Sequence, residues 1–165
     1  MHVAIDPQTI EILVTGMPEA GKSTFVRTIS KRTETTNGWL TGSIRVEENL
    51  RLRLIEPPHI EQFDFLSLRE LIESVDVAGF IIVCDSTRPE YFGALIGLLE
   101  TIHFNHEEAP MIVVTNHPDA PGAWGADDIR LGLNIPNFID VMACDVQRVE
   151  EVKNVVLRLL MRIIG

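Results

Sequence analysis

The sequence is poor in cysteine and in basic residues. Its 165 residues include 2 cysteines, Cys84 and Cys144, and both fall in apolar segments. So few cysteines exclude a small domain held by disulfides, and their positions are typical of buried thiols in a reducing compartment, so we expect a cytoplasmic protein. Lys and Arg number 14 against 24 Asp and Glu, a formal charge of −10. This charge disfavours general binding to nucleic acids or anionic membranes, although one local site can still hold an anion.

Long apolar runs are also missing. No stretch approaches the roughly 18 residues that a membrane-spanning helix needs, and the first residues lack the pattern of a signal peptide. At 45% hydrophobic and 23% charged residues, the composition is that of a globular protein rather than a disordered chain. The length predicts a single domain over residues 1–165.

Short apolar runs alternate with amphipathic stretches. Helices are predicted at 22–31, 63–75, 89–104, 127–133 and 149–164, and six strands at 9–15, 43–46, 50–55, 79–84, 111–115 and 138–143. The short link at 47–49 makes the second and third strands an antiparallel pair. The alternation elsewhere predicts an α/β fold, a mostly parallel sheet with the five helices on both faces. Ligands of such sheets bind beyond the carboxyl ends of the strands, so the loops there should form one site.

Residues 16–24, GMPEAGKST, follow the first predicted strand and match the P-loop pattern G-x-x-x-x-G-K-S. In such a loop, backbone N–H groups and the positive end of the next helix surround phosphate groups. Gly21 lets the backbone approach closely, Lys22 reaches the outer phosphates, and the Ser23 hydroxyl suits Mg²⁺. A glycine-rich turn with an incidental lysine is the alternative. We expect the Glu19 carboxylate to point to solvent. The predicted phosphate-binding residues are Pro18, Glu19, Ala20, Gly21, Lys22, Ser23 and Thr24.

Residues 116–119, NHPD, follow the predicted strand 111–115. The Asp119 carboxylate would accept hydrogen bonds from the N1–H and 2-amino groups of guanine, donors that adenine does not offer. Asn116 would tie this loop to the phosphate loop, and His117 would cover the base. A plain Asn/Asp/Pro turn is the alternative. In a chain that also has a phosphate loop, the pattern favours guanine binding.

Together these motifs resemble the Ras-like small GTPases, most closely the bacterial MglA-like and Rup members. The similar stretches are GMPEAGKST, FIIVCDSTRPE, VVTNHPD, APGAW with DDIRLGL, and ACDVQRVEEVKNVVLRLL. The resemblance implies a Ras-like G domain that binds GTP or GDP with Mg²⁺. It places Cys144 and Asp145 where family members back the guanine with main-chain N–H groups, and which of these residues donates stays open. It also implies protein partners of the roadblock/LC7 type.

The two switch regions depart from the family pattern. By the resemblance, Thr36 is the switch I threonine that completes the Mg²⁺ shell, in a loop at 31–41 that is short for a mobile switch. Glu56 falls where many relatives carry the Asp that holds Mg²⁺ through water, and a solvated strand end is the alternative. His59 falls at the switch II glycine, and Ile60 at the glutamine that orients the attacking water.

Three functions fit these residues. The first is a small guanine-nucleotide-binding protein with weak or no GTP hydrolysis that acts through protein partners. The second is a pseudo-GTPase, a Ras-like fold that serves as a protein-interaction module with weak or absent nucleotide binding. The third, a small P-loop kinase, fits least, because such a kinase needs several phosphate-clamping arginines and the candidate loops are poor in arginine.

The isoleucine at position 60 leads to a prediction about the rate of GTP hydrolysis. Because isoleucine cannot orient water, GTP hydrolysis should be no faster than about 10⁻⁴ s⁻¹, the level of an unassisted small GTPase. Ile60→Gln should raise the rate, and adding His59→Gly should raise it further by restoring backbone freedom to the segment. Single-turnover hydrolysis with saturating Mg²⁺ measures all three proteins. A wild-type rate near 1 s⁻¹ without a partner would contradict this account, since another residue would then position the water.

Overall fold

A single sheet of seven strands forms the centre of the protein, in a computed structural model that describes residues 8–58 and 65–165. The strand order is β2-β3-β4-β1-β5-β6-β7, and β3 alone runs against the others. The strands are β1 (Gln8–Gly16), β2 (Arg32–Thr36), β3 (Trp39–Glu47), β4 (Leu50–Glu56), β5 (Gly79–Asp85), β6 (Met111–Asn116) and β7 (Asp140–Ala143).

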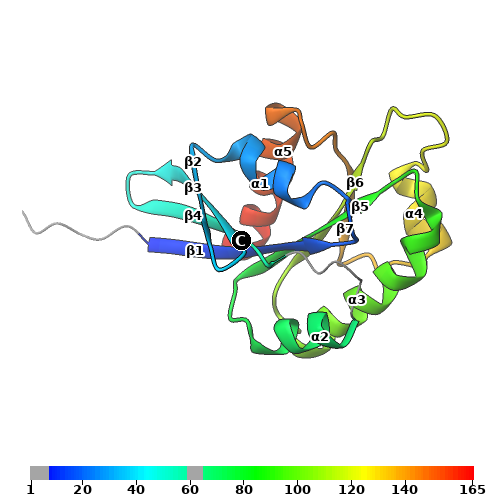
Figure 1. The fold of residues 1–165 in the computed structure, drawn as a ribbon, viewed down its shortest axis with the longest axis horizontal. Coiled ribbons are helices and arrows are strands. Elements are labelled where there is room, and N and C mark those ends of the chain that lie inside the picture. The colour runs from blue at the N-terminus through cyan, green and yellow to red at the C-terminus, as the bar shows by residue number, and fades with distance from the viewer. Residues whose placement is uncertain (1–7, 59–64) are drawn as a thin grey trace, which may run out of the picture.

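Helices cover both faces of this sheet, as the alternation predicts. Figure 1 shows α1 and α5 on one face, α2 and α3 on the other, and α4 beside β7. None of the helices in the described part of the chain is both long and apolar enough to cross a bilayer. The helices are α1 (Lys22–Ile29), α2 (Phe65–Ser74), α3 (Phe92–Asn105), α4 (Ala126–Gly132) and α5 (Val149–Ile164), with a 3₁₀ turn, η1 (Pro89–Tyr91), ahead of α3.

The prediction of six strands is wrong, because the expected loop at 31–41 contains a strand. β2 pairs with an extended β3 from Arg32↔Ser43 to Thr36↔Trp39. Asn37 and Gly38 form the turn with φ angles of 52° and 84°. Positive φ at both central residues is what a two-residue hairpin requires, and Asn-Gly is the favoured pair for it. A threonine-rich segment before such a turn suits an edge strand.

Burial explains why the other strands lie where the sequence predicts them. All six residues of β6 and six of the seven in β5 are buried, so their unbroken apolar runs fit a parallel sheet covered on both sides. Cys84 and Cys144 are free and buried, and burial raises the pKa of each thiol to about 12. The last strand is shorter than predicted, since it begins at Asp140 and leaves Phe138 half exposed.

Gly42 in β3 tests how tightly the end of α1 packs on the sheet, and Gly93 in α3 serves as its control. A Cβ on Gly42 in β3 would lie 2.0 Å from Ser30 Oγ and 2.8 Å from Ser30 Cβ. Gly42→Ala should therefore lower the free energy of unfolding by about 1–3 kcal/mol. Gly93→Ala in α3 is the matched control, because its Cβ would meet no described atom within 4 Å. The free energy of unfolding of Gly93→Ala should rise by about 0.5–1 kcal/mol, because alanine has the higher helix propensity. Urea unfolding measures both, and equal losses would show that the contact with Ser30 does not decide the outcome.

Candidate functional site

The phosphate loop leaves β1 by a backbone path that only glycine permits. Gly16 has φ 142°, and a Cβ there would lie 2.0 Å from the carbonyl oxygen of Val83 in the neighbouring strand. The next residue, Met17, donates its N–H to this same oxygen at 3.1 Å. Gly21 has φ 108°, and its Cβ would lie 2.6 Å from Asn116 Nδ2. Both glycines thus let the loop pack directly on the β5 and β6 ends.

The first turn of α1 carries the predicted phosphate contacts. Gly21 is the N-cap of α1 and has no side chain to bond the first N–H groups of the helix. Lys22 is largely buried at the helix start, and burial lowers its pKa, while attraction to Glu56 acts in the opposite direction. Thr24, two residues further along, is exposed. A helix N-terminus with a lysine in its first turn is suited to a polyphosphate.

Ser23 and Glu56 form the part of the site that fits a cation. Ser23 Oγ donates to the two carboxylate oxygens of Glu56, at 2.9 and 2.7 Å. Glu56 is 2% exposed, so the alternative of a solvated strand end is wrong. A hydroxyl and a carboxylate, both hard oxygen donors, beside a phosphate loop are the ligand types that Mg²⁺ prefers. The residues present therefore fit the ion.

Thr36 is not brought next to this pair. It ends β2 with an exposed side chain, paired with Trp39 across the hairpin turn. β2 lies two strands from β4, a separation of about 10 Å at ordinary strand spacing. The metal role of Thr36 therefore stays a prediction. His59 and Ile60, the switch II positions, lie outside the described residues.

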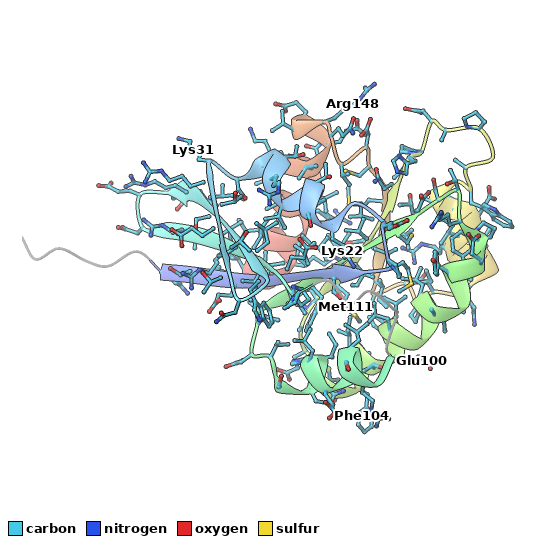
Figure 2. The ribbon with its side chains drawn as sticks, in the orientation of Figure 1. Lys22, Lys31, Glu100, Phe104, Met111 and Arg148 are labelled. Atoms are coloured by element: carbon cyan, nitrogen blue, oxygen red, sulfur yellow. The ribbon has the colours of Figure 1, made fainter. Side chains whose placement is uncertain are left out.

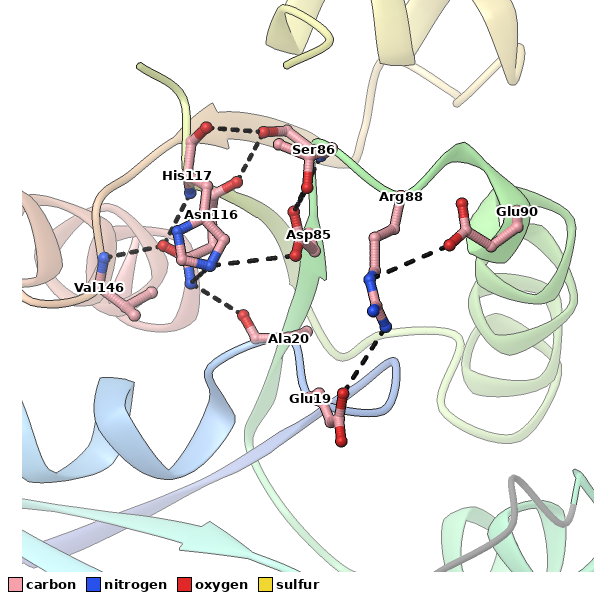
Figure 3. Close-up of polar contacts among 10 residues, drawn as sticks. Glu19, Ala20, Asp85, Ser86, Arg88, Glu90, Asn116, His117 and Val146 are labelled. Atoms are coloured by element: carbon pink, nitrogen blue, oxygen red, sulfur yellow. Dashed lines mark hydrogen bonds and ion pairs between the residues drawn. The ribbon is translucent and has the colours of Figure 1, made fainter. Parts of the chain in front are cut away.

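Asn116 joins three loops at the carboxyl edge of the sheet, as Figure 3 shows. Its side chain is buried, and its Nδ2 donates to the carbonyl oxygen of Ala20 in the phosphate loop at 2.9 Å. Its Oδ1 accepts from the backbone N–H of His117 at 2.9 Å and of Val146 at 3.2 Å. The predicted tie between Asn116 and the phosphate loop is present, and it extends to the loop after β7.

Ser86 supports the loop of residues 116–119, the candidate base loop, and the sequence did not indicate this role. It is fully buried, and its Oγ bonds the carbonyl oxygens of Asn116 at 2.7 Å and His117 at 3.1 Å. The preceding residue, Asp85, makes a local turn, because its Oδ1 accepts from both the N–H and the hydroxyl of Thr87, at 2.9 and 2.6 Å. A serine after a buried strand has no local signal for contacts formed with residues 30 positions away.

His117 and Asp119 present side chains at the surface of this edge. His117 adopts φ 60°, its side chain is 49% exposed, and its Nε2 lies 4.0 Å from Asp85 Oδ2. Asp119 is exposed in the turn that the N–H of Ala120 closes by donating to the His117 carbonyl at 3.2 Å. Both side chains are therefore accessible to a ligand above the Asn116 junction.

The three consecutive N–H groups after β7 have different partners. Cys144 donates to the Thr115 carbonyl oxygen at 3.1 Å, a main-chain bond that continues the β6–β7 ladder. Val146 donates to Asn116. Asp145 between them donates to the Glu151 carboxylate, Oε1, at 3.2 Å. Of the two residues that the sequence left open, Asp145 is thus the one whose N–H is bonded to a side chain and not to the sheet.

Glu19 points away from the loop, as predicted. Its side chain is 83% exposed, and Arg88 Nη1 lies 3.7 Å from its Oε2. Arg88 also lies 4.0 Å from Glu90, as Figure 3 shows. Its guanidinium group lies over the Tyr91 ring, 5.8 Å from the ring centroid. The φ of Glu19 is 55°, a left-handed conformation that turns its side chain outward. A carboxylate in the loop therefore need not oppose a bound phosphate.

Comparison with known proteins identifies the fold. No protein-family model matches the sequence, and neither does any curated protein. The structure is similar to that of the Arl6/BBS3 small GTPase from Trypanosoma brucei with the bound nucleotide analogue GppNp. The TM-score is 0.76 over 94% of this chain and 98% of that chain, at 14% sequence identity. The chain has the small GTPase fold. At this identity the likeness defines the fold alone.

The Asn116 junction can be tested apart from any ligand. Asn116→Asp keeps the acceptor but sets a buried carboxylate against the Ala20 carbonyl, so it should cost at least about 2 kcal/mol of unfolding free energy. Asn105→Asp is the matched control, because the Asn105 amide also donates to a carbonyl, that of Thr101 at 2.9 Å, but at an exposed site. It should cost less than about 1 kcal/mol. Urea unfolding gives both values, and a similar loss in both would mean that the junction contributes little.

Proposed function

We propose that the protein is a small guanine-nucleotide-binding protein that holds GTP or GDP with Mg²⁺ at the carboxyl edge of its sheet. The observation that carries this proposal is the Asn116 amide, which connects the phosphate loop, the NHPD loop and the loop after β7. A nucleotide spans several of these loops at once, and their rigid connection sets the distance between phosphates and base. The Arl6/BBS3 structure, which has the same fold, contains a bound nucleotide analogue, and this supports nucleotide binding by the present fold.

In this proposal the phosphate side uses backbone N–H groups of residues 18–24 and the ammonium group of Lys22. Ser23 is the Mg²⁺ ligand, and Glu56 stands beside it to hold the ion's water. Mg²⁺ would neutralise part of the phosphate charge. Thr36 joins this shell only if its hairpin turn moves toward β4.

The base side uses the exposed Asp119 carboxylate to accept the guanine N1–H and 2-amino donors, with His117 against the ring. The N–H of Asp145 is the donor to the guanine carbonyl. Cys144 backs this loop from the buried side, since its own N–H continues the ladder to β6. A site arranged this way selects guanine over adenine, because adenine presents an acceptor at N1 to the Asp119 carboxylate and an amino donor to the Asp145 N–H.

The proposal also includes slow hydrolysis and action through protein partners. Slow hydrolysis is inferred from Ile60 and His59 in the sequence alone. Action through protein partners is inferred from the resemblance to bacterial MglA-like and Rup GTPases. The proposed partner class is roadblock/LC7-type proteins, and the proposed compartment is the cytoplasm. A protein-interaction module without nucleotide is the second candidate, and the same experiment separates the two.

Titration of the purified protein with GDP and ADP in Mg²⁺ tests the binding site. GDP should bind at least about 1,000-fold more tightly than ADP. The Lys22→Ala variant should bind GDP at least about tenfold more weakly than wild type, because it lacks a charge-assisted contact to the phosphates. Lys31→Ala is the matched control, since Figure 2 places Lys31 at the periphery of the protein, away from Lys22. No binding of either nucleotide would favour the interaction module, and a preference for ADP would favour a kinase.

A further inference from the structure

Of the three N–H groups of residues 144–146, that of Asp145 is the one bonded neither to the sheet nor to Asn116, and Glu151 is its acceptor. Its Oε1 accepts the N–H of Asp145 at 3.2 Å. The side chain lies in the first turn of α5 and is 36% exposed, so it can rotate into solvent without leaving a buried vacancy. The partners of Cys144 and Val146, in contrast, are a buried main-chain carbonyl and a buried amide.

We propose that Glu151 is a built-in competitor of the nucleotide base: its carboxylate holds the Asp145 N–H until the carbonyl oxygen of a 6-oxopurine replaces it. This inference rests on the proposed function and names a regulator of the same site. An anionic carboxylate is a stronger acceptor than a neutral carbonyl. Each binding event must therefore displace the stronger acceptor, and each release lets it return. Glu151 thus weakens nucleotide affinity and favours release.

Arg148 gives the displaced carboxylate a second partner. Its Nε lies 3.6 Å from Glu151 Oε2 and 3.5 Å from Asp145 Oδ2. Because the Arg148 contact uses the oxygen that does not accept the Asp145 N–H, Glu151 can give up one bond and keep the other. The two positions of the carboxylate therefore differ by one partly buried hydrogen bond, which keeps the exchange reversible.

The decisive variants are Glu151→Ala and its matched control Glu150→Ala. Both residues lie in the first turn of α5, so both variants remove the same charge from the same helix end. Glu151→Ala should bind GDP about 2- to 10-fold more tightly than wild type and release it more slowly, the range that one net hydrogen bond supports. Glu150→Ala should leave GDP affinity unchanged. Thermal unfolding of each protein checks that the fold survives.

A second measurement follows the Asp145 amide itself. In ¹⁵N-labelled protein without nucleotide, Glu151→Ala should shift the Asp145 amide proton upfield, because it loses a charged acceptor. With saturating GDP, the Asp145 signals of wild type and Glu151→Ala should coincide, because the base has replaced the carboxylate in both. Wild-type binding is measured first. If GDP does not bind at all, the proposed function fails, and the apo amide shift still reports whether Glu151 holds this N–H.

Three outcomes would overturn the competitor role while leaving guanine binding intact. Weaker GDP binding by Glu151→Ala would show that the carboxylate braces the loop for the base. Equal tightening by Glu150→Ala would show a general charge effect of the helix end. Asp145 signals that differ between wild type and variant at saturating GDP would show that Glu151 stays on this N–H when the base is bound.

Discussion

The buried amide of Asn116 is the interaction on which the site depends. One side chain supplies a donor to the phosphate loop and an acceptor to two backbone N–H groups, so it links segments 96 and 30 residues away in sequence. A buried amide left without these partners would cost several times the value of one exposed hydrogen bond. The loops that meet there are therefore fixed relative to one another, while their outer side chains stay accessible.

Electrostatics separates the two ends of the site. At the phosphate end, Lys22 and Glu56 lie close together in a partly buried setting, where the lysine's charge is disfavoured by burial and supported by the carboxylate. At the proposed base end, the Asp119 carboxylate is exposed, and the side chains of Asp145 and Glu151 are 32% and 36% exposed. An overall charge of −10 is thus compatible with an anionic ligand, because one cation, a helix N-terminus and a hydroxyl for Mg²⁺ act locally.

The edge hairpin shows how a segment expected to be a loop can contain a strand. The resemblance to small GTPases places Thr36 in a switch I loop at residues 31–41, just before Asn37-Gly38. The same Asn-Gly pair is the strongest short signal for a two-residue hairpin turn, and it closes β2 onto β3. Pro58 lies against this turn, since a Cβ on Gly38 would meet its ring at 3.0 Å. The local sequence supports both structures, and packing at the sheet edge chooses between them.

The sequence by itself determined the α/β class, the parallel core strands, the phosphate loop and the position of the base loop. These follow from local patterns: apolar runs of strand length, glycines at fixed spacing, and a lysine at a helix start. Only the tertiary structure decided that Glu56 is buried against Ser23, that Ser86 holds the base loop, and that Asp145 rather than Cys144 keeps its N–H off the sheet. Each of these is a contact between residues brought together by strand order, and periodicity along the chain carries no information about which distant groups that order makes neighbours.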